Sequence, residues 1–409
     1  MLTVEEASKL VLQHATVLPA SEVPLSEALG LALAEVVTSD IDSPPHDKSV
    51  VDGYAIVAAD LAGGSADFEV LEEVTAGSVP TRTVSRGQAT RIMTGAPLPA
   101  GADAVVMVEY CEAIAAAGGL ERVRLGAPRT AAGQNIVRRA TSLAQGQVVL
   151  EPGVRLRPAE IGLLAEVGRA RVRAIARPNV AIVSTGNELV GVHDSPGPGQ
   201  IRNSNGPLLT ASTVAAGATA LDLGIARDER PELHGKFSKG LAADVLIISG
   251  GVSAGVLDLV PSVLDELGVR QVFHKVSLKP GKPIWFGHRA REKGQTLVFG
   301  LPGNPVSSFV CFELFVKPAL RALAGLPSCT RVLRAELSVG QLHRGDRPTY
   351  QPARLVFAEG KQQVAPLRWH GSGDLRVLSD ANALVHFPAG ERQYETGEVV
   401  DVFSLADWQ

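Results

Sequence analysis

The sequence predicts a multidomain α/β protein in which a three-layer α/β/α domain is combined with β-rich modules. The chain has 409 residues, too many for one core of ordinary size. Between residues 178 and 327, short apolar strands alternate with helical segments of about ten or more residues, a pattern typical of a parallel sheet covered on both faces. The flanking regions carry short alternating runs between turns rich in Gly and Pro, which favour small β-domains.

The N-terminal region has a helical pattern. Thr3 and Glu6 have the spacing of a capping box, and apolar residues follow at helical spacing through residue 16. A second helix is expected over residues 25–37, before a Pro-Pro pair breaks the chain at 44–45.

Residues 46–140 change character and predict an inserted, mostly β domain. A helix is then predicted to begin near Pro158 and to end before Gly168, so the sequence returns to a helical pattern like that of the N-terminal region. We therefore expect residues 1–45 and 141–177 to form one elongated mixed domain around the insertion. The strands predicted within the insertion are 68–72, 82–84, 104–108 and 123–125.

The central region, residues 178–327, carries the strand and helix alternation. After it, residues 328–409 revert to short strands with turn signals, as expected for a C-terminal β-barrel. In the central region, the predicted strands are 180–184, 219–223, 245–249 and 297–300, and the predicted helices are 207–216, 230–241, 261–267 and 306–323.

Composition excludes several classes of function. A net charge of −4 removes the electrostatic reason to expect binding to nucleic acid or to an anionic membrane. No stretch approaches the roughly 20 apolar residues of a membrane span, and the N-terminus is acidic where a signal peptide would be basic. The three cysteines are far apart and match neither a disulfide framework nor a zinc site. We expect a cytoplasmic protein with reduced thiols.

Three loops follow strands of the central region, and ligands of open α/β sheets bind beyond the carboxyl ends of the strands. The first is 185–188, which a simple polar turn would also explain. The second is the Gly-rich 250–255, followed by Asp258. The third, 300–308, opens directly into a long apolar helix, so it presents backbone N–H groups and a positive helix end to an anion. This third loop is the strongest candidate for a phosphate site.

Cationic and anionic side chains fall near these loops. If residues 272–285 are extended, Lys275 and Lys279 point to the same face, where two ammonium groups repel unless an anion lies between them. Lys282 follows in a Pro-Gly-Lys-Pro turn. Carboxylates on the loops supply hard oxygen ligands, so a phosphate carried with Mg²⁺ suits the region. These carboxylates are Glu188, Asp228 and Asp258.

Taken in order along the chain, the motifs resemble one family. Residues 49–55 read S-V-V-D-G-Y-A against the family pattern S-x-M-D-G-Y-A, and residues 91–97 match R-I-x-T-G-A-P. The sequence is similar over nearly its whole length to MoeA and to the E domain of gephyrin. The further segments that carry the resemblance are 101–106, 184–189, 203–205, 249–253, 279–283 and 301–305.

The resemblance implies a specific architecture and reaction. The family has four domains, of which the α/β domain is MogA-like, and it forms a homodimer through the elongated domain. Its site lies where the α/β domain of one subunit faces the β-domain of the other. Its members take molybdopterin activated as an AMP adduct, hydrolyse the phosphoanhydride with Mg²⁺, and insert molybdate to give molybdenum cofactor and AMP. Other molybdenum-cofactor proteins are further potential partners.

The resemblance also implies roles for particular residues. Asp52 and Thr94 would reach the site from the β-domain, and the three carboxylates named above would serve Mg²⁺ and the adenylate. The three lysines would neutralise phosphate or molybdate. The remaining residues implied to bind the pterin nucleotide or the oxyanion are Gly250, Gly251, Ser253, Pro302, Gly303, Asn304, Pro305, Ser307 and Ser372.

The sequence departs from the family pattern at several of these positions. Ala140, Thr141 and Ser142 replace a glycine and two acidic residues, Pro352 stands where the family has an arginine, and Asn187 replaces a frequent Asp. A divergent paralogue that inserts tungstate, or that binds the pterin nucleotide without full activity, is therefore the alternative. A scaffold and a pterin-adenylating enzyme are less favoured, because no extra partner domain appears and three modules surround the α/β region.

Overall fold

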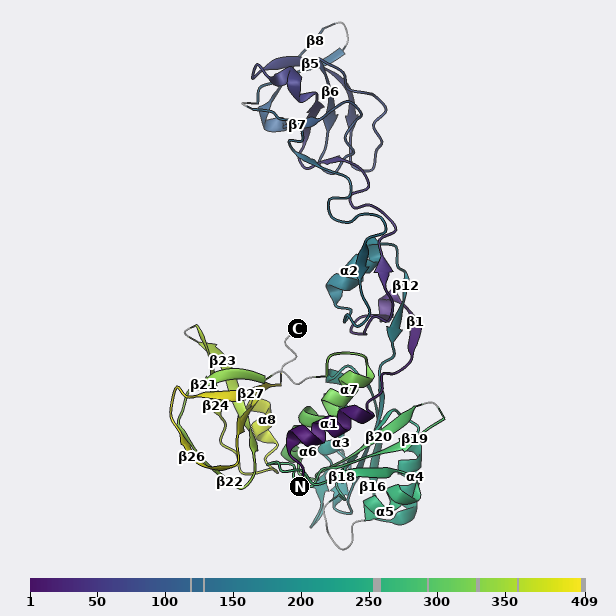
Figure 1. The fold of residues 1–409 in the computed structure, drawn as a ribbon, viewed down its shortest axis with the longest axis vertical. Helices are drawn as coiled ribbons and strands as arrows, with labels where there is room; N and C mark the ends of the chain where they lie inside the picture. Colours follow the sequence, from purple (N-terminus) through teal and green to yellow (C-terminus); the bar gives the residue numbers. More distant parts are fainter. Residues whose placement is uncertain are drawn as a thin grey trace. The chain divides into compact units, whose positions relative to one another are not determined.

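The computed structural model of the chain describes residues 1–117, 120–127, 129–252, 259–292, 294–328, 332–358 and 360–405. It divides into two compact units, each described below by itself. The first unit comprises Met1–Ala34, Gly153–Arg157 and Arg171–Gln409, and the second comprises Glu35–Pro152 and Pro158–Ala170. The predicted multidomain α/β fold class is confirmed (Figure 1).

The first unit is built on a six-stranded sheet with the order β16-β13-β17-β20-β19-β18. The four strands that the sequence predicted pair in parallel as expected, in the order β16-β13-β17-β20, whereas β19, which was not predicted, pairs antiparallel with both β20 and β18. The chain between β19 and β20 is too short for the crossover that parallel strands need. The strands are β13 (Asn179–Thr185), β16 (Thr219–Ala226), β17 (Val245–Ser249), β18 (Arg270–His274), β19 (Trp285–Ala290) and β20 (Gln295–Leu301).

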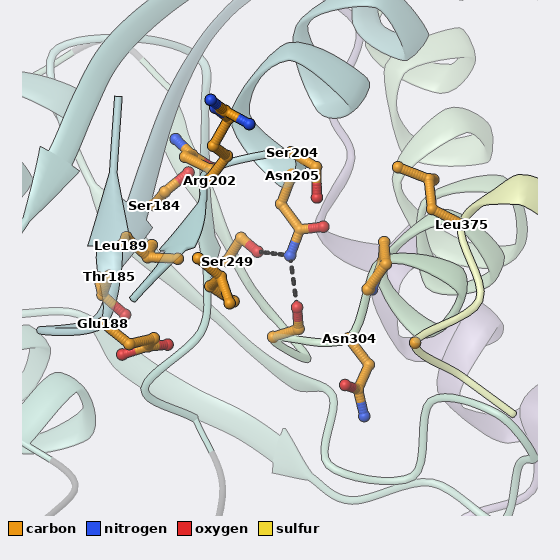
Figure 2. A pocket seen from close by; sticks show the side chains of 15 residues that line it. Ser184, Thr185, Glu188, Leu189, Arg202, Ser204, Asn205, Ser249, Asn304 and Leu375 are labelled. Atoms are coloured by element: carbon orange, nitrogen blue, oxygen red, sulfur yellow. Dashed lines mark hydrogen bonds between the residues drawn. The ribbon is translucent and has the colours of Figure 1, made fainter. Parts of the chain in front are cut away.

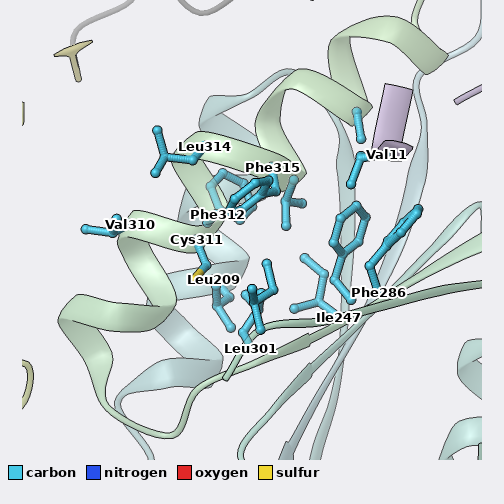
Figure 3. Close-up of a cluster of buried hydrophobic side chains, with 14 of the residues drawn as sticks. Val11, Leu209, Ile247, Phe286, Leu301, Val310, Cys311, Phe312, Leu314 and Phe315 are labelled. Carbon is cyan, nitrogen blue, oxygen red and sulfur yellow. The ribbon is translucent and has the colours of Figure 1, made fainter. Parts of the chain in front are cut away.

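Helices cover both faces of this sheet. Successive residues of a strand point to opposite faces, so Val180 and Ile182 pack in one apolar cluster and Ala181 and Val183 in the other. The first cluster, drawn in Figure 3, lies under α1 (Val4–His14), α3 (Asn205–Ala215), α6 (Pro305–Cys311), a π-helical turn (Phe312–Val316) and α7 (Lys317–Leu323). The second lies under α4 (Arg230–Gly240) and α5 (Leu259–Glu266).

The N-terminal capping box is confirmed. The Thr3 hydroxyl accepts the backbone N–H of Glu6 at 3.2 Å, and the Glu6 carboxylate accepts that of Thr3 at 2.8 Å. The second helix expected over 25–37 was wrong. After β1 (Ala20–Pro24), paired with β12 (Arg171–Ile175), only the 3₁₀ turn Leu25–Glu27 forms.

Two features explain that error. Gly30 has a φ of 82°, which ends the turn, because L-residues rarely adopt this conformation. Ala32 and Leu33 then form β-bridges to Arg155 and Ala174. These partners lie more than a hundred residues away in the sequence, and pairing with them buries apolar residues that had suggested a helix face.

The C-terminal part of the first unit is a closed β-barrel, as predicted. Its strands are β21 (Val332–Leu337), β24 (Lys361–Pro366), β23 (Thr349–Ala358), β25 (Ala383–Phe387) and β27 (Val399–Ser404). A separate antiparallel pair, β22 (Gln341–Gly345) with β26 (Gly390–Tyr394), and the short helix α8 (Arg376–Asp380) complete it.

The second unit contains a six-stranded sheet with the order β7-β4-β6-β5-β9-β8. Residues 82–84, expected as a strand, form a loop, because the Glu72 carboxylate accepts the backbone N–H groups of Thr81 and Arg82 at 3.0 and 2.8 Å. The strands are β4 (Gly53–Ile56), β5 (Ala66–Val74), β6 (Gln88–Ile92), β7 (Ala104–Met107), β8 (Cys111–Ala117) and β9 (Leu120–Leu125), and the 3₁₀ turns are Ala58–Leu61 and Val108–Tyr110.

Two strand pairs and one helix complete this unit. Helix α2 (Pro158–Glu166) ends before Gly168, whose φ is 72°, as the sequence predicted. The strand pairs are β2 (Val37–Thr38) with β11 (Val148–Leu150) and β3 (Lys48–Ser49) with β10 (Ile136–Val137). None of the helices in the described part of the chain is long and apolar enough to cross a membrane.

Ala140 stands where the family pattern has glycine, and its φ is 60°. This conformation costs an L-residue roughly 1–2 kcal/mol, while glycine loses about 0.5–1 kcal/mol in chain entropy. We therefore expect Ala140→Gly to raise the free energy of unfolding by about 0.5–1 kcal/mol, measured by chemical denaturation. Ala131→Gly is the control and should lower it, because Ala131 is not among the described non-glycine residues with positive φ. Equal destabilisation by both changes would contradict the prediction.

Candidate functional site

A cavity of about 490 Å³ opens at the carboxyl edge of the sheet in the first unit. Strands β13 and β17 end there at Thr185 and Ser249, and both residues line it (Figure 2). Other walls come from the segment before α3, from the loop after β20 and from the barrel residues Gly373 and Leu375. The cavity therefore lies where strand topology predicts a ligand site.

Asn205 ties three sides of this cavity together. Its Nδ2 donates to Ser249 Oγ and to the carbonyl of Gly303, both at 2.7 Å (Figure 2). The start of α3 is thus fixed to the ends of β17 and of the loop after β20. Because the carbonyl of Gly303 can only accept, these bonds also fix which atom of the Asn205 amide is the donor.

Three buried polar atoms in residues that line the cavity have no hydrogen-bond partner among the described residues. They are Ser184 Oγ, Thr185 Oγ1 and Asn205 Oδ1. Buried polar groups in folded proteins are nearly always paired, and an unpaired one costs about 1–3 kcal/mol. Three such atoms around one cavity indicate a wall that is completed by a polar ligand.

The predicted Gly-rich loop begins directly after Ser249, which lines the cavity. Gly250 has a φ of 93°, and a Cβ there would lie 2.5 Å from the carbonyl oxygen of Thr185. Its N–H donates to the carbonyl of Leu301 at 3.0 Å. Gly251 also has a positive φ, of 63°. Ser253 and Asp258, predicted from the same loop, lie outside the described residues.

Two of the three predicted carboxylates lie close together. Glu188 lines the cavity, and partial burial together with the charge of Glu188 raises the pKa of Asp228. Asn187 fixes the backbone at Asp228, because its Oδ1 accepts the backbone N–H of Asp228 at 3.1 Å. Within the described residues no group of three potential metal ligands forms, so the trio completed by Asp258 remains a prediction.

The three lysines do not line this cavity. The stretch 272–285 is not extended as assumed, because Lys275 has a φ of 72° and its N–H donates to the carbonyl of Ile284 at 2.9 Å, folding the segment back. Lys279 instead packs on the barrel, where its carbonyl accepts the N–H of Tyr350 at 2.8 Å. Its charge lowers the pKa of His343, together with burial, which is the larger cause. The hydrogen bond and the charge of Arg347 lower the pKa of Asp346, and the charge of Lys282 adds a smaller contribution in the same direction.

The predicted loop 302–305 forms the wall toward the barrel. Gly303, Asn304 and Pro305 line the cavity. Asn304 Nδ2 donates to Ser372 Oγ at 2.9 Å, and the N–H of Val306 donates to the carbonyl of Ser372 at 3.0 Å. Through these two hydrogen bonds, Ser372 connects the C-terminal part of the unit to this loop.

Two neighbouring residues support that loop from below. Ser308 Oγ donates to the carbonyl of Pro302, and Ser307 is buried at the start of α6. The loop that the sequence singled out as a phosphate site is thus held on both sides by hydrogen bonds.

Asp52 and Thr94 lie together in the second unit, although 42 residues separate them. The backbone N–H and the hydroxyl of Thr94 both donate to Asp52 Oδ1, each at 2.7 Å. These two bonds lower the pKa of Asp52. The pair that the resemblance singled out is therefore one hydrogen-bonded group.

Removing the Thr94 hydroxyl should raise the pKa of Asp52. A depressed carboxyl pKa contributes stability above its unfolded value, and that stability is lost as the pH falls through the folded value. In Thr94→Val this contribution should be smaller and its loss should be complete at a higher pH than in the wild type, because only the backbone bond remains. NMR titration of the Asp52 carboxyl would measure the shift. Thr75→Val, whose hydroxyl bonds only to Ser78, is the control, and an unchanged Asp52 titration in Thr94→Val would contradict the prediction.

Sequence reasoning gave no site role to several residues of the cavity wall, although all of them except Arg202 lie in the segments 184–189, 203–205 and 249–253 that carry the family resemblance. They are Ser184, Thr185, Arg202, Asn203, Ser204, Asn205 and Ser249. Three of them stand at the last positions of strands, so applying the strand-end rule to the strand residues themselves would have found them. Asn205 gave no such signal, because its partners are 44 and 98 residues away.

Arg354 does not take the place of the arginine missing at Pro352. Its Nη1 donates to the carbonyl of Asp380, the last residue of helix α8, at 3.1 Å. Pro352 is itself buried in β23, and its carbonyl accepts the N–H of Leu367 at 2.9 Å. The cationic fork is therefore absent from this position of the barrel.

Comparison with known families accounts for nearly the whole chain. Residues 2–168 match the MoeA N-terminal region (domain I and II), residues 181–322 a probable molybdopterin binding domain, and residues 334–405 the MoeA C-terminal region (domain IV). Two solved structures of the molybdopterin biosynthesis MoeA protein from Pyrococcus horikoshii have TM-scores of 0.81 and 0.80. They are 32% and 29% identical, and each comparison covers 99–100% of this chain and 100% of the other.

Curated relatives agree with this assignment. The molybdopterin molybdenumtransferase of Bacillus subtilis is 37% identical over 400 residues, which are 94% of this chain and 90% of the relative. The enzyme of the same name from Staphylococcus epidermidis is 33% identical over 409 residues, 98% of this chain and 95% of the relative. The chain therefore belongs to the MoeA family, that of the molybdopterin molybdenumtransferases.

Proposed function

We propose that the protein is a molybdenum insertase, which transfers molybdate into adenylylated molybdopterin with Mg²⁺-dependent release of AMP. The observation that carries the proposal is the cavity at the carboxyl edge of the sheet, with three unpaired polar atoms in its wall and the Glu188–Asp228 pair beside it. Its volume of about 490 Å³ is in the range of small-molecule sites. The names of the curated relatives support the same reaction class.

The carboxylate pair suits Mg²⁺. Neither Glu188 nor Asp228 makes an ion pair with another described residue, and burial, with a smaller contribution from the charge of Glu188, raises the pKa of Asp228. Mg²⁺ prefers carboxylate oxygens and usually binds one or two of them together with substrate phosphates. We propose Glu188, Asp228 and Asp258 as its ligands. Bound there, Mg²⁺ would neutralise charge that develops on the phosphoanhydride as AMP leaves.

The residues of the chain would position and neutralise the substrate. Asn205 holds the cavity wall in place, and the buried hydroxyls of Ser184 and Thr185, which have no partner among the described residues, would bond to the pterin nucleotide. We propose that Gly250, Gly251 and Ser253 let the backbone approach the nucleotide. Lys275, Lys279 and Lys282 would neutralise phosphate or molybdate from the barrel side.

We further propose that the protein works as a cytoplasmic homodimer. In this arrangement Asp52 and Thr94 of one subunit would serve the site of the other. The hydrogen bonds from Thr94 support this role, because they keep the Asp52 carboxylate ionised and oriented.

One assay tests the proposed function. The purified protein is incubated with adenylylated molybdopterin, Mg²⁺ and molybdate, and both AMP release and cofactor formation are followed. Release of AMP coupled to cofactor formation is expected. No AMP release would overturn the enzymatic proposal. AMP release without metal transfer, or transfer with tungstate alone, would favour the divergent paralogue, for which the loss of the arginine at Pro352 is the structural reason.

A further inference from the structure

The start of helix α3 faces the cavity. The helix spans Asn205–Ala215, and both Ser204, which precedes it, and Asn205 line the cavity. Arg202, at the end of the short strand β15 (Ile201–Arg202), which pairs with β14 (Leu189–Val190), lines it too (Figure 2). The positive end of an eleven-residue helix and a guanidinium group therefore meet on one wall.

The donors on this wall are largely unused. The Ser204 side chain makes no cap hydrogen bond to α3. Arg202 Nε donates to the carbonyl of Asp194 at 3.0 Å, which fixes the guanidinium. Its two Nη atoms make no hydrogen bond or ion pair within the described residues. A fixed guanidinium with free Nη atoms matches the bidentate geometry of a phosphate group.

A second observation points to a ligand here. Ser184 is fully buried and Thr185 is 3% exposed, both line the same cavity, and both hydroxyls have no partner. Ser184 Oγ lies beneath the first turn of α3, because a Cβ on Gly206 would be 3.3 Å from it. Hydroxyl groups can donate to phosphate oxygens as well as accept.

Charge divides the cavity into two parts. Among the described residues that line it, Arg202 is the one cation and Glu188 the one carboxylate. We propose that Arg202, Ser204 and the N-terminus of α3 form a phosphate subsite that binds one phosphoryl group of the substrate. This assignment rests on the proposed function, in which the substrate carries a phosphoanhydride. It is separate from the loop 302–305, on which the sequence had centred the phosphate.

Binding of AMP and of adenosine, measured by calorimetry, tests the subsite. Arg202→Gln should weaken AMP binding about tenfold or more, since a hydrogen bond to a charged group contributes roughly 1.5–3 kcal/mol, and it should leave adenosine binding unchanged. Arg202→Lys keeps the charge but loses the planar guanidinium, so its AMP affinity should lie between those of the wild type and of Arg202→Gln. Arg289→Gln, in β19, is the matched control. Arg289 pairs with Thr296 near the start of β20, whereas the cavity lies at the end of that strand.

A second pair of ligands identifies which phosphoryl group is bound. The same variants are titrated with 6-hydroxymethylpterin phosphate and with unphosphorylated 6-hydroxymethylpterin. A selective loss for AMP places the adenylate phosphate in the subsite, and a selective loss for the pterin phosphate places the pterin side there. Either result supports the proposal. Equal losses for phosphorylated and unphosphorylated ligands, or no loss at all, would overturn it.

These binding experiments are independent of the transferase assay. If the wild type releases no AMP but Arg202→Gln selectively weakens phosphate binding, the proposed function fails and the subsite stands. If the wild type is an active insertase and Arg202→Gln binds every ligand normally, the subsite fails alone.

Discussion

Replacing Asp228 by asparagine is expected to slow AMP release by on the order of a hundredfold or more, because charge stabilisation at a metal-assisted site contributes several kcal/mol. The substitution removes one of two carboxylates held close together beside the cavity. It should also raise the Mg²⁺ concentration needed for half-maximal rate. AMP release measured over a Mg²⁺ series at fixed substrate separates these two effects.

The pH dependence of the same variant provides a second readout. Burial and Glu188 raise the pKa of Asp228, so protonation of this carboxyl begins at a higher pH than for an ordinary Asp. The wild-type rate should therefore fall on the acid side as Asp228 takes up its proton. This limb should be lost from the residual activity of Asp228→Asn.

A matched control for this substitution lies on the preceding strand. Asp222→Asn removes a carboxylate of β16 whose Oδ1 accepts only the local N–H of Gly224 at 2.8 Å. Its rate and Mg²⁺ dependence should equal those of the wild type. An Asp228→Asn protein with full activity and an unchanged Mg²⁺ requirement would refute the metal-ligand assignment.

Local patterns were sufficient to predict much of the fold. The capping box at Thr3 and Glu6 and the alternation over 178–327 depend on neighbours within a few residues, and both predictions are confirmed. The failures depend on distant partners. The apolar run that suggested a helix over 25–37 is buried by bridges to Arg155 and Ala174 instead.

The candidate site follows the same division. Strand ends and Gly-rich loops pointed to Glu188 and to the loop 302–305, because the topology of an α/β sheet determines where its strands end. The lysine assignment assumed an extended backbone, and the positive φ of Lys275 was not readable from its neighbours. The segment 203–205 carries the family resemblance, but the role of Asn205 could not be predicted, since it joins segments that are far apart in the sequence.

Gly250→Ala is expected to have the second large effect, because the added Cβ would disturb both the stability of the fold and the shape of the cavity. The φ of 93° at Gly250 is unfavourable for any L-residue, and the new Cβ would lie 2.5 Å from the carbonyl oxygen of Thr185, which belongs to a central strand and cannot move freely. Strain of roughly 1–2 kcal/mol and overpacking of roughly 1–3 kcal/mol together predict a loss of about 2–5 kcal/mol in the free energy of unfolding.

Gly268→Ala separates these two costs. Gly268 has a φ of 77°, but a Cβ there would meet nothing within 4 Å, so it should lose only the conformational part. Chemical denaturation of both variants gives the difference, and AMP binding shows its consequence for the cavity. Because the clash pushes on Thr185, Gly250→Ala should lose AMP affinity while Gly268→Ala keeps it. If the two variants were equally stable and bound AMP equally well, the close approach of Gly250 to Thr185 would have no role in shaping the site.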